Sequence, residues 1–286
     1  MSAADHSIDG AEQQVLGPQT DAKRVGPGDT GQHLKGTLIV VCGVLWLSPD
    51  SMLIKLVESD GGWETMFWRH VFYALTMTIG ILAHCTWWPP RAADGIKSGW
   101  AVPRAFAVWR ERIVDTGRYG VVWILVQVPA NLGFIIGQSH TTAANVLIVV
   151  STAPLWSALI SWVFLSEPPP LRTVVAIFCA MIAIVALFWS ELVVSTDELA
   201  GLLLALMCAL GLALNFNLLR RAAVAVPHAH FPVLFPFQSL VCGAVALLCG
   251  AKPGNLLLED LPWVVIQGCC VVPISFIALT IGPKYI

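Results

Sequence analysis

The sequence predicts an all-α integral membrane protein with eight transmembrane helices. Of its 286 residues, 57% are hydrophobic and only 12% are charged, whereas a soluble domain carries about 25% charged residues. Apolar segments recur along most of the chain, and each is close to the roughly 20 residues that a helix needs to cross a bilayer. Since every backbone group inside the bilayer must be paired internally, segments of this length indicate a bundle of helices.

The apolar segments give the expected spans, most of which are joined by very short linkers. The eight spans cover residues 36–57, 63–84, 119–137, 141–165, 171–190, 197–219, 231–250 and 262–281. The long linker 85–118 carries six basic residues, and we expect an amphipathic surface segment around Trp100–Ile113. Residues 1–35 are polar and lack the apolar region of a secretory signal, so they are expected to form a disordered cytoplasmic tail.

Basic residues predict the orientation of the chain in the membrane. With the N-terminus in the cytoplasm, thirteen Lys and Arg residues fall on cytoplasmic segments and one, Lys252, falls on the opposite side. Cytoplasmic loops of membrane proteins carry such an excess of Lys and Arg. Because no organelle signal is evident, we expect the plasma membrane, or the inner membrane of a bacterium. No basic surface indicates nucleic acid, and the eight cysteines show no zinc-site spacing, so we expect neither a metal nor another cofactor.

The first span contains Pro49, Asp50 and Lys55 within seven positions. An aspartate at the bilayer centre costs about 2.5–3.5 kcal/mol on insertion scales, so Asp50 must face the bundle interior or a wet cavity. Pro49 removes a helical hydrogen bond and is expected to free the carbonyl near position 45. Asp50 then either binds a proton or a cationic substrate, pairs with Arg69 to fix helix packing, or marks a loop-like break. Lys55 is expected to snorkel to the outer surface.

Further polar side chains fall inside the spans. Gln127 and Asn131 lie one turn apart on the third span, and Asn145 and Asn215 lie on the fourth and sixth. These amides either line a substrate pocket or hold helices together. Arg69 either contacts an anionic substrate or neutralises a nearby carboxylate.

Small residues recur at every fourth position of the sixth span. These are Gly201, Ala205, Ala209 and Ala213. Such a stripe lets two helix backbones approach closely, so we expect it to form a helix–helix interface.

A weak internal repeat relates the two halves of the chain. The segments IIGQSHT (135–141) and TIGPKYI (280–286) follow the third and eighth spans at an offset of about 145 residues. Five spans separate them, and an odd number of spans per repeat makes the copies inverted in the membrane. Inverted repeats are typical of secondary transporters, which bind substrate near the bilayer midplane. The repeats would be residues 36–190 and an incomplete copy, 197–286.

Residues 139–167 resemble the drug/metabolite transporter superfamily and, within it, the EamA-type transporters. Ser166 departs from the glycine usual in the family, while Leu45–Trp46 and Lys55 resemble its first span and Met66–Arg69 its second. The matching positions in the fourth span are Thr142, Ala143, Ala144, Asn145, Ala153, Pro154, Ala158 and Glu167.

This resemblance implies ten helices in two inverted five-helix repeats, of which the last two helices are missing here. It also implies transport of small metabolites. We expect the chain to be a fragment of such a protein; a reduced member would need a partner or a second copy to close its cavity. Pro49, Pro154 and Glu167 are expected to act in structure or gating.

These observations predict a secondary transporter that moves a small metabolite by alternating access. An enzyme is not expected, because the spans contain no HExxH, no GxSxG and no paired aspartates. No GxxxxGK[ST] motif indicates direct use of ATP. The alternative is a non-transporting membrane scaffold or assembly partner, which would apply if the eight-helix chain is complete.

Overall fold

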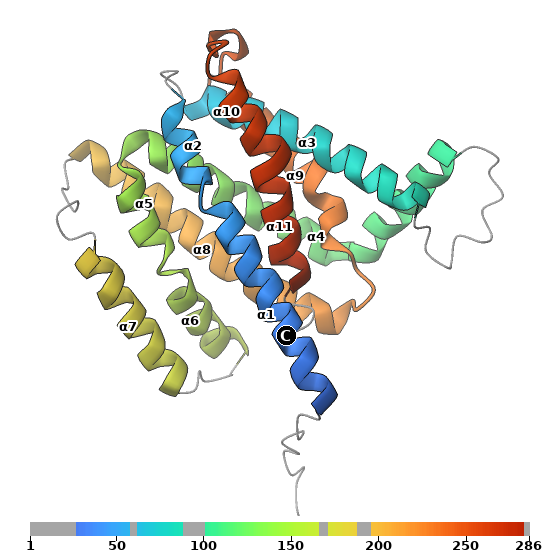
Figure 1. Cartoon of the computed structure of the whole chain (residues 1–286), viewed down its shortest axis with the longest axis horizontal. Helices are drawn as coiled ribbons and strands as arrows, with labels where there is room; N and C mark the ends of the chain where they lie inside the picture. The colour runs from blue at the N-terminus through green and yellow to red at the C-terminus, as the bar shows by residue number, and fades with distance from the viewer. Residues whose placement is uncertain (1–26, 58–61, 88–100, 166–170, 188–195, 283–286) are drawn as a thin grey trace, which may run out of the picture.

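A computed structural model of the chain describes residues 27–57, 62–87, 101–165, 171–187 and 196–282 (Figure 1). These residues form helices and no strand. Seven helical segments are long and apolar enough to cross a bilayer, which confirms an all-α, multi-pass membrane protein. The seven segments are Leu34–Leu56, Gly62–Thr86, Ala105–His140, Ala143–Val163, Glu198–Ala225, Phe231–Leu248 and Leu261–Ile281.

Two sequence predictions need adjustment at the ends of the helices. Helix α1 (Pro27–Leu47) begins nine residues before the predicted span, so part of the expected disordered tail is helical. Once a helix exists, each added residue gains a hydrogen bond, and proline suits its first position. The fifth predicted span, 171–190, corresponds to α7 (Leu171–Leu187), whose apolar part Leu171–Ala183 falls short of a full span among the described residues. Helix α7 lies at the edge of the bundle beside α6 (Figure 1).

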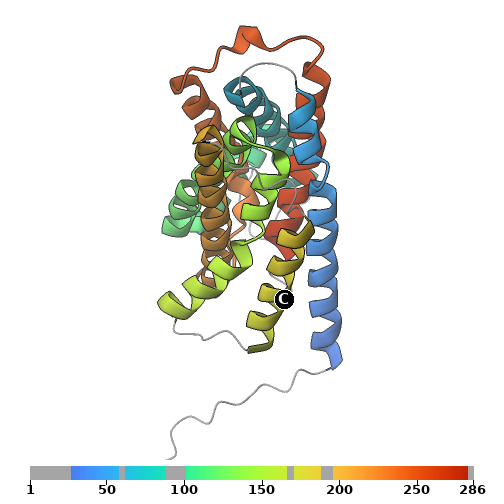
Figure 2. The ribbon, with the colours of Figure 1, turned by 90° about the vertical axis from the view of Figure 1, so that its left-hand side faces the viewer.

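The first span is broken at Ser48–Pro49 into α1 and α2 (Asp50–Leu56). The backbone N–H of Ser48 donates to the carbonyl oxygen of Leu45 at 3.2 Å, and its hydroxyl donates to the carbonyl oxygen of Val44 at 3.3 Å. The carbonyl near position 45 is therefore bonded by a tightened turn, contrary to the expectation that proline would leave it free. Figure 2 shows α1 running along one side of the bundle.

The fourth span is also two helices, α5 (Ala143–Val150) and α6 (Ala153–Leu165), where one continuous helix was expected. Pro154 is the second residue of α6, where its missing N–H costs nothing but prevents a continuous helix. The hydroxyls of Ser151 and Thr152 each donate at 2.6 Å to the carbonyl oxygens of Ile148 and Val149. The break thus keeps its backbone groups paired, as a membrane interior requires.

Helix α4 (Ala101–His140) packs along α8 (Thr196–Ala225). A Cβ atom on Gly133 of α4 would overlap the carbonyl oxygen of Leu204 on α8, so the two backbones lie in direct contact. The predicted stripe is confirmed, because Gly201 is buried and its three alanines are completely buried.

The predicted surface segment forms the first part of α4, before a kink at Gly117, whose φ is 50°. Here Ala105, Val108 and Trp109 are buried against the region of η3 (Phe231–Leu234). The indole N–H of Trp109 donates to the carbonyl oxygen of Val233 at 3.0 Å. This amphipathic segment is therefore bound to the bundle by its apolar face.

Helix α3 (Gly62–Trp87) packs against α9 (Phe235–Leu248). Tyr73, Trp123, Phe235 and Phe276 form a connected group of aromatic rings with centroids 5.3–6.3 Å apart. This group belongs to one hydrophobic core cluster, and its Phe276 also lines the cavity described next.

The last span contains a third irregularity. It consists of α10 (Leu261–Ile266), the π-helical turn η5 (Gln267–Val271) and α11 (Val272–Ile281). Gly268 of this turn lies against the backbone of Arg69 and Tyr73, where a Cβ would meet the Arg69 carbonyl oxygen at 2.7 Å. The indole N–H of Trp46 on α1 donates to the Cys270 carbonyl oxygen at 3.3 Å. The π turn therefore joins α1 to α3. A short turn, η4 (Pro253–Asn255), precedes this span.

Candidate functional site

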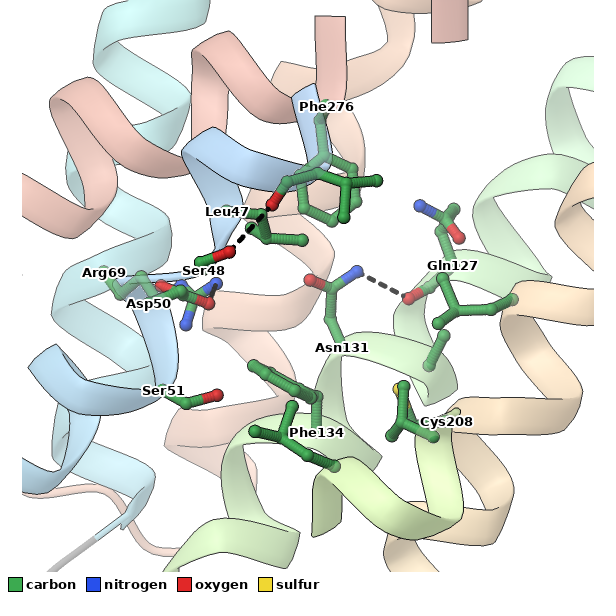
Figure 3. Close-up of a pocket in the computed structure, with 15 residues that line it drawn as sticks. Leu47, Ser48, Asp50, Ser51, Arg69, Gln127, Asn131, Phe134, Cys208 and Phe276 are labelled. Carbon is green, nitrogen blue, oxygen red and sulfur yellow. Dashed lines mark hydrogen bonds and ion pairs between the residues drawn. The ribbon is translucent and has the colours of Figure 1, made fainter. Parts of the chain in front are cut away.

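A cavity of about 300 Å³ lies midway along the bundle, at the level of the breaks in the first and fourth spans (Figure 3). Its walls come from α1, α2, α3, α4, α5, α8 and α11. The fifteen lining residues are Val44, Leu47, Ser48, Asp50, Ser51, Arg69, Gln127, Ala130, Asn131, Phe134, Leu147, Val150, Cys208, Leu212 and Phe276. Discontinuous helices around a midplane cavity are typical of the substrate sites of transporters.

The Asp50–Arg69 pair forms one wall of the cavity. The Nη2 atom of Arg69 lies 2.9 Å from Oδ2 of Asp50, and the two residues are only 2% and 1% exposed. Oδ1 of Asp50 and the Nε and Nη1 atoms of Arg69 have no hydrogen-bond partner within the described protein. A buried arginine–carboxylate pair is frequently held by two parallel hydrogen bonds. In this pair Arg69 keeps unpaired donors and Asp50 keeps an unpaired acceptor.

The break in the first span positions Asp50. As the first residue of α2, its carboxylate lies at a helix N-terminus, where a negative charge is favoured. Arg69 reaches it from α3, less than two turns from the start of that helix. Two of the alternatives for Asp50, the ion pair with Arg69 and the break in the helix, are both present in the structure. The carboxylate also lies in the wall of the cavity, as the third alternative, binding of a proton or substrate, requires.

Gln127 and Asn131 form the opposite wall, one turn apart on α4 as the sequence predicted (Figure 3). The side-chain amide of Asn131 donates to the carbonyl oxygen of Gln127 at 2.9 Å. That carbonyl lies four residues before Asn131, so the bond holds the amide side chain against its own helix. Oε1 of Gln127 has no partner within the described protein and is available to a ligand.

Apolar side chains make up the remainder of the lining. Phe134 and Phe276 come from α4 and α11, Leu147 and Val150 from α5, and Leu212 from α8. The site therefore combines an apolar interior with a few polar groups that could orient a small molecule, as ligand sites commonly do.

Two of the six residues predicted to bind substrate do not line this cavity. Asn145 is buried at the start of α5, where its side-chain amide donates to the Thr141 hydroxyl at 3.1 Å. Asn215 is buried in α8 and its Oδ1 has no described partner. Its neighbour Asn217 instead bonds the hydroxyl and carbonyl oxygen of Ser157 on α6, so amides in this part of α8 connect helices.

The two proline positions lie at helix breaks, but only one is beside the cavity. Pro49 directly precedes Asp50, whereas Pro154 lies in α6 next to a separate hollow bounded by α7. Glu167 lies outside the described residues. The sequence did not indicate Phe134, Cys208 or Phe276 as lining residues, since apolar and small residues in spans carry no signal of which side they face.

Hydrogen bonds that the sequence did not reveal join α2, which lines the cavity with Asp50 and Ser51, to the end of α4. The Nζ atom of Lys55 donates to the carbonyl oxygens of Gln138 and Thr141, the latter at 2.9 Å. The side-chain amide of Gln138 donates to the Ser51 hydroxyl at 3.2 Å. Lys55 therefore binds the C-terminal end of α4, where a cation is favoured, and the residue remains exposed, in agreement with the expected position near the surface.

The chemistry available at the site is recognition of charge and of hydrogen-bonding groups. Arg69 can donate to an anion, and Asp50 and Gln127 can accept from a donor. Among the described residues, no three His, Cys, Asp or Glu side chains gather closely enough to hold a metal ion.

The sequence matches no family model and no curated protein. One solved structure, described as "Crystal structure of protein", matches with a TM-score of 0.58 at 18% sequence identity. The match covers 87% of this chain and 79% of the other chain. At this level of identity the similarity concerns the fold alone.

Proposed function

We propose that this protein is a secondary transporter of a small metabolite, similar to the EamA-type members of the drug/metabolite transporter superfamily. The observation that carries the proposal is the half-bonded Asp50–Arg69 pair in a midplane cavity between broken helices. Ionisable residues inside the membrane are costly and are usually retained for a function.

The helix contacts support an arrangement of two inverted repeats. The proposed symmetry exchanges the first, second and third spans with the sixth, seventh and eighth. Under this symmetry α4 corresponds to α11 and α8 to α1, so the contact of α4 with α8 predicts a contact of α11 with α1. Helices α3 and α9 correspond to each other, so their contact maps onto itself. All three contacts are present. The cavity then lies between the two copies, where secondary transporters bind their substrates.

Alternating access requires that one end of the cavity be closed at a time. Here α2 is bonded to the corner between α4 and α5 through Lys55, Ser51 and Gln138. We assign this corner as a closed outer gate, with the N-terminus in the cytoplasm of a plasma or inner membrane as the basic residues predict. Release of a few hydrogen bonds between short helix segments is a suitable gating step.

A flux measurement tests the proposal. The purified protein is reconstituted into liposomes, which are loaded with labelled metabolites from a panel that includes monocarboxylates, amino acids and amines. Loss of each label is followed after the same unlabelled metabolite is added outside. We expect saturable flux of at least one class, lost in Arg69→Gln and retained in Arg110→Gln, which removes an exposed arginine. Flux that both variants retain would remove the site assignment. Absence of flux and of binding for every class would favour a scaffold.

A further inference from the structure

The cavity is electrically balanced, because it contains one carboxylate and one guanidinium. Asp50 and Arg69 are the only Asp, Glu, Lys or Arg among its described lining residues. Their single contact, 2.9 Å between Oδ2 and Nη2, leaves Nε and Nη1 of Arg69 without a partner within the described protein. Either nitrogen can donate a hydrogen bond to a second carboxylate while Nη2 stays bonded to Asp50.

The groups around the pair are mostly neutral and cannot balance an additional negative charge. On α3, His70 is buried with Nδ1 at 2.8 Å from the Met66 carbonyl oxygen, and Tyr73 is buried one turn after Arg69. Helix α9 contributes the Cys242 thiol, within electrostatic range of Arg69, and α8 contributes the Cys208 thiol.

The other Asp, Glu, Lys and Arg side chains of α2 and α3, Lys55 and Glu64, are engaged elsewhere. Lys55, on the same helix as Asp50, bonds the carbonyl oxygens at the end of α4. Glu64 on α3 accepts from the backbone N–H of Lys252 at 3.0 Å. The described residues of the remaining elements near the pair supply amides. These are Gln127, Asn131 and Gln138 on α4, Asn145 on α5 and Gln267 on η5.

An anion that binds Arg69 therefore places two carboxylates on one buried guanidinium. Two carboxylates that share a site cannot both remain ionised, and one of them takes up a proton. Asp50 is the carboxylate that loses part of its counterion, and its Oδ1 atom has no other partner. Charge balance is kept when one anion and one proton enter together, giving a guanidinium–anion pair beside a neutral Asp50 carboxylic acid.

We propose that the cavity binds a small monocarboxylate together with one proton, with the carboxylate on Arg69 and the proton on Asp50. This inference rests on the proposed transport function and assigns it a substrate class and a coupling ion, so that transport is anion–proton symport. The apolar walls, with Phe134, Leu147 and Phe276 among them, favour an aromatic or branched body on the acid. Oε1 of Gln127 adds one acceptor for a hydroxyl group on that body.

A zwitterion would give a different result at the same atoms. Its carboxylate would bind Arg69 while its ammonium group would bind Oδ1 of Asp50, which would then stay ionised. Binding would add no net charge and would take up no proton. Matched pairs of ligands, such as phenylacetate and phenylalanine, separate these two cases because their apolar bodies are alike.

The test is a calorimetric titration of the purified full chain with benzoate, phenylacetate, 4-methylpentanoate, phenylalanine and leucine. Each titration is done in two buffers of different ionisation enthalpy, which gives the number of protons taken up. We expect the monocarboxylates to bind with about one proton each, and the affinity to weaken about tenfold for each unit of pH rise, as linkage to one proton requires.

Variants locate the proton. Asp50→Asn should bind the same acids with no proton uptake and no pH dependence, whereas Asp115→Asn, an exposed aspartate on α4, should behave as the unaltered protein. If Asp50→Asn does not fold, the two-buffer titration of the unaltered protein still decides the question.

Three outcomes would overturn the inference. Monocarboxylate binding without proton uptake would remove the coupling, and preferential binding of phenylalanine or leucine would replace the substrate class. Flux of amines or amino acids in liposomes without binding of any acid would also overturn it while leaving transport in place. Only the loss of all flux and all binding would remove the transport proposal as well.

Discussion

The Nζ atom of Lys55 lies 2.9 Å from the carbonyl oxygen of Thr141, which follows the last residue of α4. This contact joins a seven-residue helix, α2, to the corner between two long spans, and α2 also contributes Asp50 of the buried ion pair to the cavity wall. Because the donor is charged and the acceptors lie at a helix C-terminus, the contact is favoured both as a hydrogen bond and by the helix dipole.

Loss of this contact should loosen α2. Lys55→Met keeps the length of the side chain but removes its charged donor, and hydrogen bonds to charged groups contribute about 1.5–3 kcal/mol. We expect the amides of α2 to exchange with deuterium about tenfold faster or more, which mass spectrometry of the peptide 50–57 would measure.

Lys252→Met is the matched control, because the Lys252 side chain is exposed and its backbone N–H, which bonds Glu64, is retained. Equal rates of amide deuterium exchange in α2 of the two variants would show that Lys55 does not hold α2 against the corner between α4 and α5.

The Asp50–Arg69 pair should show strong coupling in a double-mutant cycle. Removing one partner of a buried pair costs about 3–5 kcal/mol, whereas replacing both is often close to neutral. Arginine cannot lose its proton, so Asp50→Asn, which leaves a buried cation, should lower the melting temperature in detergent more than Arg69→Met. Arg69→Met leaves a carboxyl group that can become neutral by taking up a proton.

The double variant Asp50→Asn/Arg69→Met should be more stable than the sum of the two single losses indicates. Additive losses would mean that the pair contributes nothing as a pair and that each side chain is held by other contacts.

The α4–α8 interface should not accept a side chain at Gly133. Gly133→Ala would place a methyl group onto the Leu204 carbonyl oxygen, and backbone atoms cannot move aside as a flexible side chain can. We expect a loss of about 1–3 kcal/mol, seen as a lower melting temperature.

Gly80→Ala is the control for this substitution. Gly80 also lies inside a helix, and a Cβ there meets nothing within 4 Å. Alanine is favoured over glycine in a helix by about 1 kcal/mol, so the control should be unchanged or more stable. Similar losses in both variants would contradict the close contact.

The sequence contained enough information for the class of the protein and for part of its site. Hydropathy gives the spans because the bilayer fixes their length, and Gln127 and Asn131 were correctly placed on one face by their spacing alone. The sequence also offers an Asp50–Arg69 pair as one alternative, since a buried charge in a membrane needs a partner.

Other features of the site depend on contacts between distant segments and left no local signal. Lys55 meets carbonyl groups more than eighty residues away, and any residue presents such groups. Asn145 and Asn215 are ordinary buried amides in the sequence, and nothing local shows that they lie outside the cavity lining. The π turn at Gln267–Val271 is followed by Pro273, the second residue of α11, so a proline marks this break as it marks the other two.

The most direct test of the central claim, that the cavity opens alternately to the two sides of the membrane, uses Asn131→Cys in a chain whose eight native cysteines are replaced. Asn131 faces the cavity (Figure 3), so its thiol reports access to the site without knowledge of the substrate. A membrane-impermeant maleimide is added to vesicles of either orientation, with Lys55→Met as a variant that opens the outer end. We predict labelling from both sides, with the outer-side rate increased by Lys55→Met; labelling from one side only, unchanged by that substitution, would contradict the account.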